Sequence, residues 1–144
     1  MKFYSTTDLS STLYKDALDI RKVVFIHEQN VDESLEIDDL EDKALHVIGY
    51  KENKACCTAR LIEKENGLLK IQRVAVLKDY RKKGIGLLLL QEIERLAKDT
   101  FGANKLLLDS QDHAIPFYQK SGFSVYGDGF LDANIPHHHM EKRL

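Results

Sequence analysis

Apolar positions along this 144-residue chain fall into helical spacing in some stretches and strand-like spacing in others. Residues 11–30 and 85–100 carry apolar side chains three or four positions apart, which is typical of helices that bury one face. A shorter helix is predicted over Ala114–Lys120. Runs of β-branched and other apolar residues between turn residues predict strands. These strands are residues 2–5, 45–50, 55–62, 68–76, 105–109, 123–126 and 135–142.

The order of these elements predicts an α/β fold, with a mixed, mostly antiparallel sheet flanked by helices. The strand–helix–strand unit after residue 68 predicts a parallel crossover, with Val74–Val76 beside Leu106–Leu108. Asp112 is predicted to cap the third helix, and Gly127–Gly129 to turn the chain before the last strand. Nothing divides the chain, so residues 1–144 are expected to form a single domain.

The composition of the chain disfavours several classes of function. A net charge of −2 does not favour nucleic-acid binding. Cys56 and Cys57 are adjacent, and neighbouring strand residues point to opposite faces, so reduced thiols and a cytoplasmic location are predicted. The sequence contains no apolar run of membrane-spanning length, and no membrane partner is expected.

The loop at residues 81–86 reads Arg-Lys-Lys-Gly-Ile-Gly and joins a strand to a helix. The first turn of a helix has unpaired N–H groups and a partial positive charge. Gly84 and Gly86 let a ligand approach the backbone, and Arg81, Lys82 and Lys83 add positive charge. The loop is therefore predicted to bind an anion, with a diphosphate as the natural ligand.

Two segments carry a resemblance to a known family. Arg81-x-x-Gly84-x-Gly86, after Arg73-Val-Ala-Val76, resembles the acyl-CoA signature of the GNAT superfamily of N-acyltransferases. Ala114-x-x-Phe117-Tyr118-x-x-x-Gly122-Phe123 resembles the second conserved segment of that superfamily. Ile135-Pro136-His137 and Arg21-x-x-Val24-Phe25-x-x-Glu28-Gln29 are similar to the small bacterial ElaA/YjcF-like subgroup.

The resemblance implies an acetyl-CoA-dependent N-acetyltransferase in which a primary amine attacks the thioester directly in a ternary complex. It also implies a splayed parallel strand pair that takes the pantetheine arm, a glycine loop that holds the pyrophosphate, and a tyrosine near the sulfur. It allows a homodimer. The implied coenzyme A contacts are Val74, Ala75, Val76, Arg81, Lys82, Lys83, Gly84, Ile85, Gly86, Leu87 and Tyr118.

The chemistry needs a proton acceptor and a proton donor. An amine with a pKa of ~10.4 costs about 4–5 kcal/mol to deprotonate at pH 7, so a carboxylate base is useful. Glu28 is the leading candidate, and a structural pairing of Glu28 with Arg21 is the competing interpretation. The protonated phenol of Tyr118 can donate to the leaving thiolate, although Tyr118 could also be a packed aromatic.

The acidic segment 32–42 has two open interpretations: a solvated loop, or a rim that attracts a cationic amine. In the second, Asp38, Asp39 and His46 contact the acceptor and are further base candidates. His137 is expected to line the same cleft. His137 and His139 share a strand face, a spacing that can bind zinc, but surface or core histidines are favoured and no metal is predicted.

Two alternatives compete with the enzyme. The same fold could hold acyl-CoA as a sensor or partner module without turnover. A dinucleotide-binding Rossmann unit is disfavoured, because the loop lacks the third glycine of that motif and lies in the middle of the chain.

Overall fold

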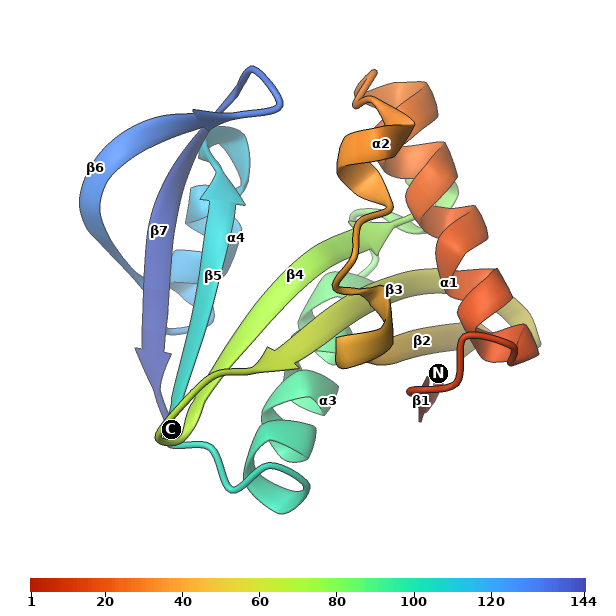
Figure 1. Cartoon of the computed structure of the whole chain (residues 1–144), viewed down its shortest axis with the longest axis horizontal. Coiled ribbons are helices and arrows are strands. Elements are labelled where there is room, and N and C mark those ends of the chain that lie inside the picture. The colour runs from red at the N-terminus through yellow and green to blue at the C-terminus, as the bar shows by residue number, and fades with distance from the viewer.

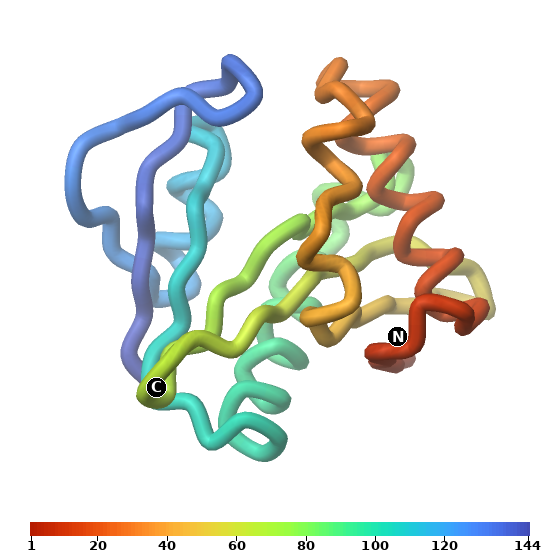
Figure 2. The backbone as a smooth tube through the Cα atoms, viewed as in Figure 1, coloured from red at the N-terminus to blue at the C-terminus, as the bar shows by residue number.

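The computed structural model describes residues 1–144, whose seven strands form one sheet in the order β1-β2-β3-β4-β5-β7-β6. Figure 1 shows the arrangement, and Figure 2 traces the backbone between the two termini. The strands are β1 (Lys2–Thr6), β2 (Leu45–Lys51), β3 (Lys54–Glu63), β4 (Leu68–Val76), β5 (Lys105–Gln111), β6 (Ser124–Asp132) and β7 (Ile135–Arg143). The α-helices are α1 (Thr12–Arg21), α2 (Glu33–Glu36), α3 (Ile85–Asp99) and α4 (Ile115–Lys120). A π-helical segment, η1 (Lys22–Glu28), extends α1, and 3-10 turns are η2 (Glu41–Lys43), η3 (Lys78–Tyr80) and η4 (Asp112–Ala114).

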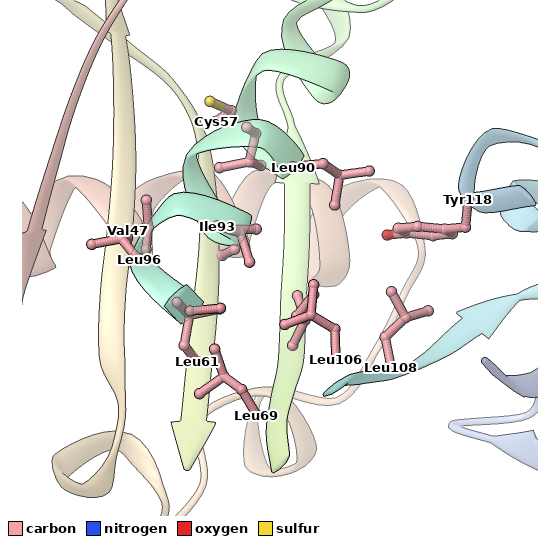
Figure 3. Packing of buried hydrophobic residues seen from close by; sticks show 14 of the residues in the cluster. Val47, Cys57, Leu61, Leu69, Leu90, Ile93, Leu96, Leu106, Leu108 and Tyr118 are labelled. Carbon is pink, nitrogen blue, oxygen red and sulfur yellow. The ribbon is translucent and has the colours of Figure 1, made fainter. Parts of the chain in front are cut away.

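Helices cover both faces of the sheet, as expected for this α/β fold (Figure 1). The predicted stripe of α1 and η1 packs as a small cluster in which Ala17, Ile20 and Val24 meet Ile48 and Ala75. The larger core lies on the other face. There Leu90 and Ile93 of α3 pack with apolar residues of the strands and with Tyr118 of α4 (Figure 3). The sheet therefore lies between α1 on one face and α3 and α4 on the other.

The parallel pair of β4 and β5 is confirmed, but its predicted register is wrong. Pairing runs from Leu68↔Lys105 to Ile71↔Leu108 and ends there. Val74–Val76 therefore lie beyond the last paired residues, where the two strands diverge (Figures 1 and 2). The prediction placed the pairing too late in β4, because an apolar pattern shows which face is buried and not where a parallel partner stops.

A β-bulge in β4 accompanies this divergence. Thr58 of β3 pairs with Ala75 and Arg60 pairs with Gln72, so β4 has one residue more than β3 over this interval. Arg73 adopts φ +56°, a left-handed conformation that is rare outside glycine. A bulge increases local twist and bends the strand, which turns the end of β4 away from β5.

The acidic segment forms a buried ion-pair network, which neither sequence interpretation anticipated. Arg21 bonds Glu36 at 2.7 Å and Glu41 at 2.7 Å. Arg60 bonds Asp38 at 2.7 Å and Glu41 at 2.5 Å. The competing interpretation, in which Glu28 pairs with Arg21, is therefore wrong, because carboxylates later in the chain bond Arg21.

Arg73 joins the same network from β4. It lies 3.0 Å from Glu36 and 3.3 Å from Asp38, and it donates to the backbone carbonyl of Leu35 at 3.1 Å. Burial opposes the charge of Asp38, but its hydrogen bonds from Arg60 and Leu40 prevail and lower its pKa to about 2. Three arginines thus balance three carboxylates between α1, the acidic segment and the bulge.

Two local predictions in the last third of the chain are wrong. Asp112 does not cap α4 through its side chain; it bonds His138 at 2.7 Å, and the helix begins after Ala114. Gly127–Gly129 lies inside β6, where the register with β7 shifts between Tyr126 and Phe130. The hairpin turns instead at Ala133–Asn134, at φ +50° and +63°.

None of the helices combines the length and the apolar character that crossing a membrane requires.

Removing Glu41 tests the network. Glu41→Ala leaves the guanidinium groups of Arg21 and Arg60 buried with fewer partners, so we expect a loss of about 3–5 kcal/mol in the free energy of unfolding. Urea denaturation measures it. Glu33→Ala, an exposed change in the same segment, should cost ~0.5 kcal/mol or less. Equal stability of the two variants would contradict a structural role for the network.

A pair of substitutions at Arg73 separates backbone strain from ion pairing. Both Arg73→Gly and Arg73→Ala lose the ion pairs, but only alanine keeps a side chain in the left-handed conformation. We expect the glycine variant to be the more stable of the two by about 1–2 kcal/mol in urea denaturation. If the alanine variant is equally or more stable, the bulge does not persist without its arginine.

Candidate active site

A cleft of about 520 Å³ opens where β4 and β5 diverge. Its walls come from η1 and α2 on one side, from β4 and β5 in the middle, and from α4 and the β6–β7 turn on the other. Val74, Ala75 and Val76 line it. Because β5 has turned away from these three residues, their backbone groups on that side lack a strand partner and face the cleft.

The two faces of β5 give the cleft two different walls. Gln111 pairs with His137, and Asp109 with His139, so these four side chains share one face. Leu106 and Leu108 alternate to the other face, where they join the core with Tyr118. Gln111 bonds Gln29 of the segment that follows η1, so the first face is the one covered by α1.

The glycine loop leads from β4 into α3. Gly84 has φ +79°, which only glycine adopts without strain, and it is the N-cap residue of α3 without a side-chain cap. The first i→i−4 bond joins the Leu88 N–H to the Gly84 carbonyl. By helix geometry, the N–H groups of Ile85, Gly86 and Leu87 therefore precede the first intrahelical acceptor. Lys82 and Lys83 are exposed on the same loop.

Phe117 of α4 covers the start of α3. A Cβ atom on Gly86 would lie 3.1 Å from the ring of Phe117, so this glycine allows α3 and α4 to approach closely. The approach brings α4, and with it Tyr118, to the same end of the cleft as the loop.

Arg81 and Glu28 connect the loop to η1. The Arg81 Nη2 group lies 2.8 and 3.1 Å from the two carboxylate oxygens of Glu28, and its Nε donates to the Val76 carbonyl at 2.8 Å. Arg81 lines the cleft. Glu28 is thus paired with a cation that lines the cleft, and Glu28 itself lies outside the cleft lining.

Tyr118 is 7% exposed and lines the cleft. Its ring extends from α4 toward α3 and β4 (Figure 3). The ring also contacts Phe117 and Phe123 edge to face. The hydroxyl has no hydrogen-bond partner within the chain, and no fully buried polar side-chain atom lacks a partner, so the hydroxyl reaches the cleft surface. Burial raises the pKa of Tyr118, which keeps the phenol protonated at neutral pH.

The acceptor residues named from the sequence do not gather in one place. His137 lines the cleft. Asp38 and His46 do not: Asp38 pairs with Arg60 and Arg73, and His46 is buried and bonded to the Glu41 carbonyl at 2.9 Å. Burial lowers the pKa of His46. Asp39 is exposed outside the cleft lining.

Two groups in the cleft were missed by sequence reasoning. Gln29 and Gln111 exchange side-chain amide hydrogen bonds at 2.8 and 3.4 Å. Asp109 bonds Lys70 at 3.0 Å and His139 at 2.6 Å. These pairs join positions 30 to 82 residues apart, so no local pattern marks them. Only the change from apolar residues at 106–108 to polar residues at 109–111 could have shown that the end of β5 is not entirely core.

Comparison with known proteins places these features in a family. The profile of the Acetyltransferase (GNAT) domain family matches residues 12–144. The uncharacterised N-acetyltransferase YjcF of Bacillus subtilis is 40% identical over 129 residues, covering 89% of this chain and 91% of that protein. A crystal structure of a putative N-acetyltransferase from Lactobacillus plantarum superposes with a TM-score of 0.91 at 24% identity, covering 99% of this chain and 97% of that one. A GNAT family acetyltransferase from Elizabethkingia anophelis, solved with acetyl-CoA bound, has the same fold with a TM-score of 0.74 at 19% identity, covering 99% and 97%.

Proposed function

The chain belongs to the GNAT acetyltransferase family, and from that premise we propose that it transfers an acetyl group from acetyl-CoA to a primary amine. The amine attacks the thioester directly while both substrates are bound. The observation that carries this proposal is the convergence, on one cleft, of an unpaired strand edge, a tyrosine hydroxyl without an internal partner and Arg81. Arg81 begins the loop that leads through Gly84 into the N-terminus of α3, and residues 82–87 themselves lie outside the cleft lining.

Acyl-CoA binding uses the first two of these features. The pantetheine amides pair with the backbone groups of Val74–Val76 that face the cleft, apart from the Val76 carbonyl that Arg81 already occupies, and act as an added strand. The diphosphate sits on the N–H groups of residues 82–87, with Lys82 and Lys83 adding charge. The Elizabethkingia relative with acetyl-CoA bound supports this choice of donor.

Tyr118 serves as the acid. As the carbon–sulfur bond breaks, a thiolate develops whose free pKa is near ~8.5, and a protonated phenol beside it lowers the barrier. The position of Tyr118 on the α3 and α4 side of the cleft, the side that carries the diphosphate loop, supports this role.

Glu28 holds Arg81 in this proposal. Its carboxylate fixes the guanidinium next to the loop, so Glu28 acts on acyl-CoA binding through Arg81. The acceptor is a primary amine of unassigned class. The preference for a cation rested on the acidic segment, whose Glu36, Asp38 and Glu41 are neutralised by arginines. The homodimer stays a prediction.

Replacement of Tyr118 tests the proposed function. Tyr118→Phe keeps the ring and removes the proton, so we expect thiol release from acetyl-CoA with a panel of primary amines to slow by about 10²-fold or more, at unchanged coenzyme A affinity. Calorimetry measures the affinity and a thiol reagent measures turnover. Tyr4→Phe, at an exposed tyrosine of β1, is the control and should match the wild type.

Two outcomes would contradict the proposal. Tight binding of coenzyme A without thiol release from any amine would favour an acyl-CoA-binding sensor or partner module. Full activity of Tyr118→Phe would show that another group protonates the sulfur.

A further inference from the structure

The ring of His137 is oriented by a single short hydrogen bond. Its Nδ1 lies 2.6 Å from the backbone carbonyl oxygen of Ile135. A carbonyl oxygen only accepts, so Nδ1 carries the proton. In the neutral imidazole the other nitrogen, Nε2, then holds a lone pair. The bond to Ile135 thus turns His137 into a fixed proton acceptor at Nε2.

The free nitrogen lies at the surface of the cleft. His137 is 8% exposed and lines the cleft. Nε2 has no partner within the chain, and no fully buried side-chain nitrogen or oxygen lacks one, so Nε2 retains some contact with the cleft interior. Phe130 packs against the ring at 5.8 Å between centroids and limits its rotation. A nine-tenths buried side chain with an unpartnered acceptor nitrogen therefore belongs to the lining of the cleft.

The other candidate bases lack one of these properties. Glu28 is held by two hydrogen bonds from Arg81. His139 bonds the carboxylate of Asp109 and lies outside the cleft lining. His113 lines the cleft, but it is exposed and no hydrogen bond orients it. His137 alone among these four combines a fixed tautomer, a free acceptor nitrogen and a place in the cleft.

His137 also lies on the opposite side of the cleft from Tyr118. It shares a sheet face with Gln111, the face covered by α1, whereas Tyr118 packs against the other face. A thioester held at the strand edge between the two faces would have its sulfur toward Tyr118 and its other side open to an amine near His137. In direct attack the amine adds to one face of the carbonyl and the sulfur then leaves from the tetrahedral adduct, so a base beside the nitrogen and an acid beside the sulfur need separate positions around the carbonyl carbon.

We propose that Nε2 of His137 accepts the proton of the attacking amine. This inference rests on the proposed acetyltransferase function and assigns its general base. The nitrogen–carbon bond forms and the carbon–sulfur bond breaks; Nε2 takes the proton that the nitrogen gives up, and Tyr118 protonates the sulfur. The proton on His137 then returns through water to the Tyr118 phenolate, which restores both groups; the one proton released for each ammonium acetylated is the one that the ammonium loses to solvent before the neutral amine attacks.

Other titratable groups face the same region. On the shared sheet face are Asp109, Lys70 and His139, with Asp109 bonded to both of the others. Asp132 of the β6–β7 hairpin and His113 after β5 also line or border the cleft. Because these groups share the region with His137, the comparison between variants, and not the wild-type pH profile alone, carries the inference.

A kinetic comparison tests the assignment. His137→Gln keeps a polar side chain but removes the base, so we expect kcat for thiol release with primary amines, or with water as the acceptor, to fall by about 10²–10⁴-fold. The ascending limb of the pH profile, in which kcat rises with pH, should disappear. The affinity for coenzyme A, measured by calorimetry, should stay unchanged. The matched controls are His138→Gln, on the same strand but bonded to Asp112, and His113→Gln in the same cleft; both should keep the wild-type profile.

A second measurement requires no amine substrate. Long-range ¹H–¹⁵N spectra of the histidine-labelled protein should show His137 with a protonated Nδ1 and an unprotonated Nε2 at mildly alkaline pH, with His137→Gln providing the assignment. A protonated Nε2 under these conditions would overturn the proposal even if no acceptor is turned over.

The outcomes separate this inference from the function on which it rests. Coenzyme A binding and turnover by the wild type, together with an unaltered pH profile in His137→Gln, would overturn the role of His137 and leave the acetyltransferase intact. If Glu28→Gln instead abolishes the ascending limb at unchanged coenzyme A affinity, Glu28 is the base. If the wild type does not bind coenzyme A, the proposed acetyltransferase function is itself contradicted.

Discussion

The left-handed backbone of Arg73 is the constraint on which the cleft depends. One extra residue in β4 places Arg73 at φ +56° and bends the strand just after its last pairing with β5. A non-glycine residue in this conformation is costly, and the structure around it holds it there. Glu36, Asp38 and the carbonyl of Leu35 all bond its guanidinium, which ties the acidic segment to the bulge. The acidic segment is therefore part of the support of the cleft.

The cleft that results is asymmetric in a way that suits acyl transfer. The side toward α3 and α4 carries the hydroxyl of Tyr118, and Arg81 lines the cleft at the start of the loop that leads into α3. The other wall, toward α1, carries the amides of Gln29 and Gln111 and the imidazole of His137. Burial keeps the phenol protonated, and the bond to Ile135 leaves a lone pair on the imidazole. A donor and an acceptor of protons thus stand on opposite sides of the strand edge.

The sequence predicts the frame of this protein better than the details of its site. The order of elements, the parallel pair and the loop before α3 follow from local apolar periodicity and from glycines with cations beside a helix start. The Gly127–Gly129 segment misled the prediction because a glycine pair marks both turns and bulges, and the actual turn at Ala133–Asn134 has no glycine. The partners of Arg21 could not be predicted, because Glu36 and Glu41 lie 15 and 20 residues away and reach it only through the packing of α1 on the sheet. The free nitrogen of His137 depends on one hydrogen bond whose direction no sequence pattern encodes.

Hydrogen–deuterium exchange with and without coenzyme A tests the central claim most directly, because the claim concerns backbone amides. If the diverging strand edge and the loop form one acyl-CoA site, coenzyme A should slow exchange at Val74, at Val76 and across residues 82–87, and should leave the amides of β1 and β2 unchanged. Slower exchange confined to other elements, or no change at saturating coenzyme A, would contradict the account.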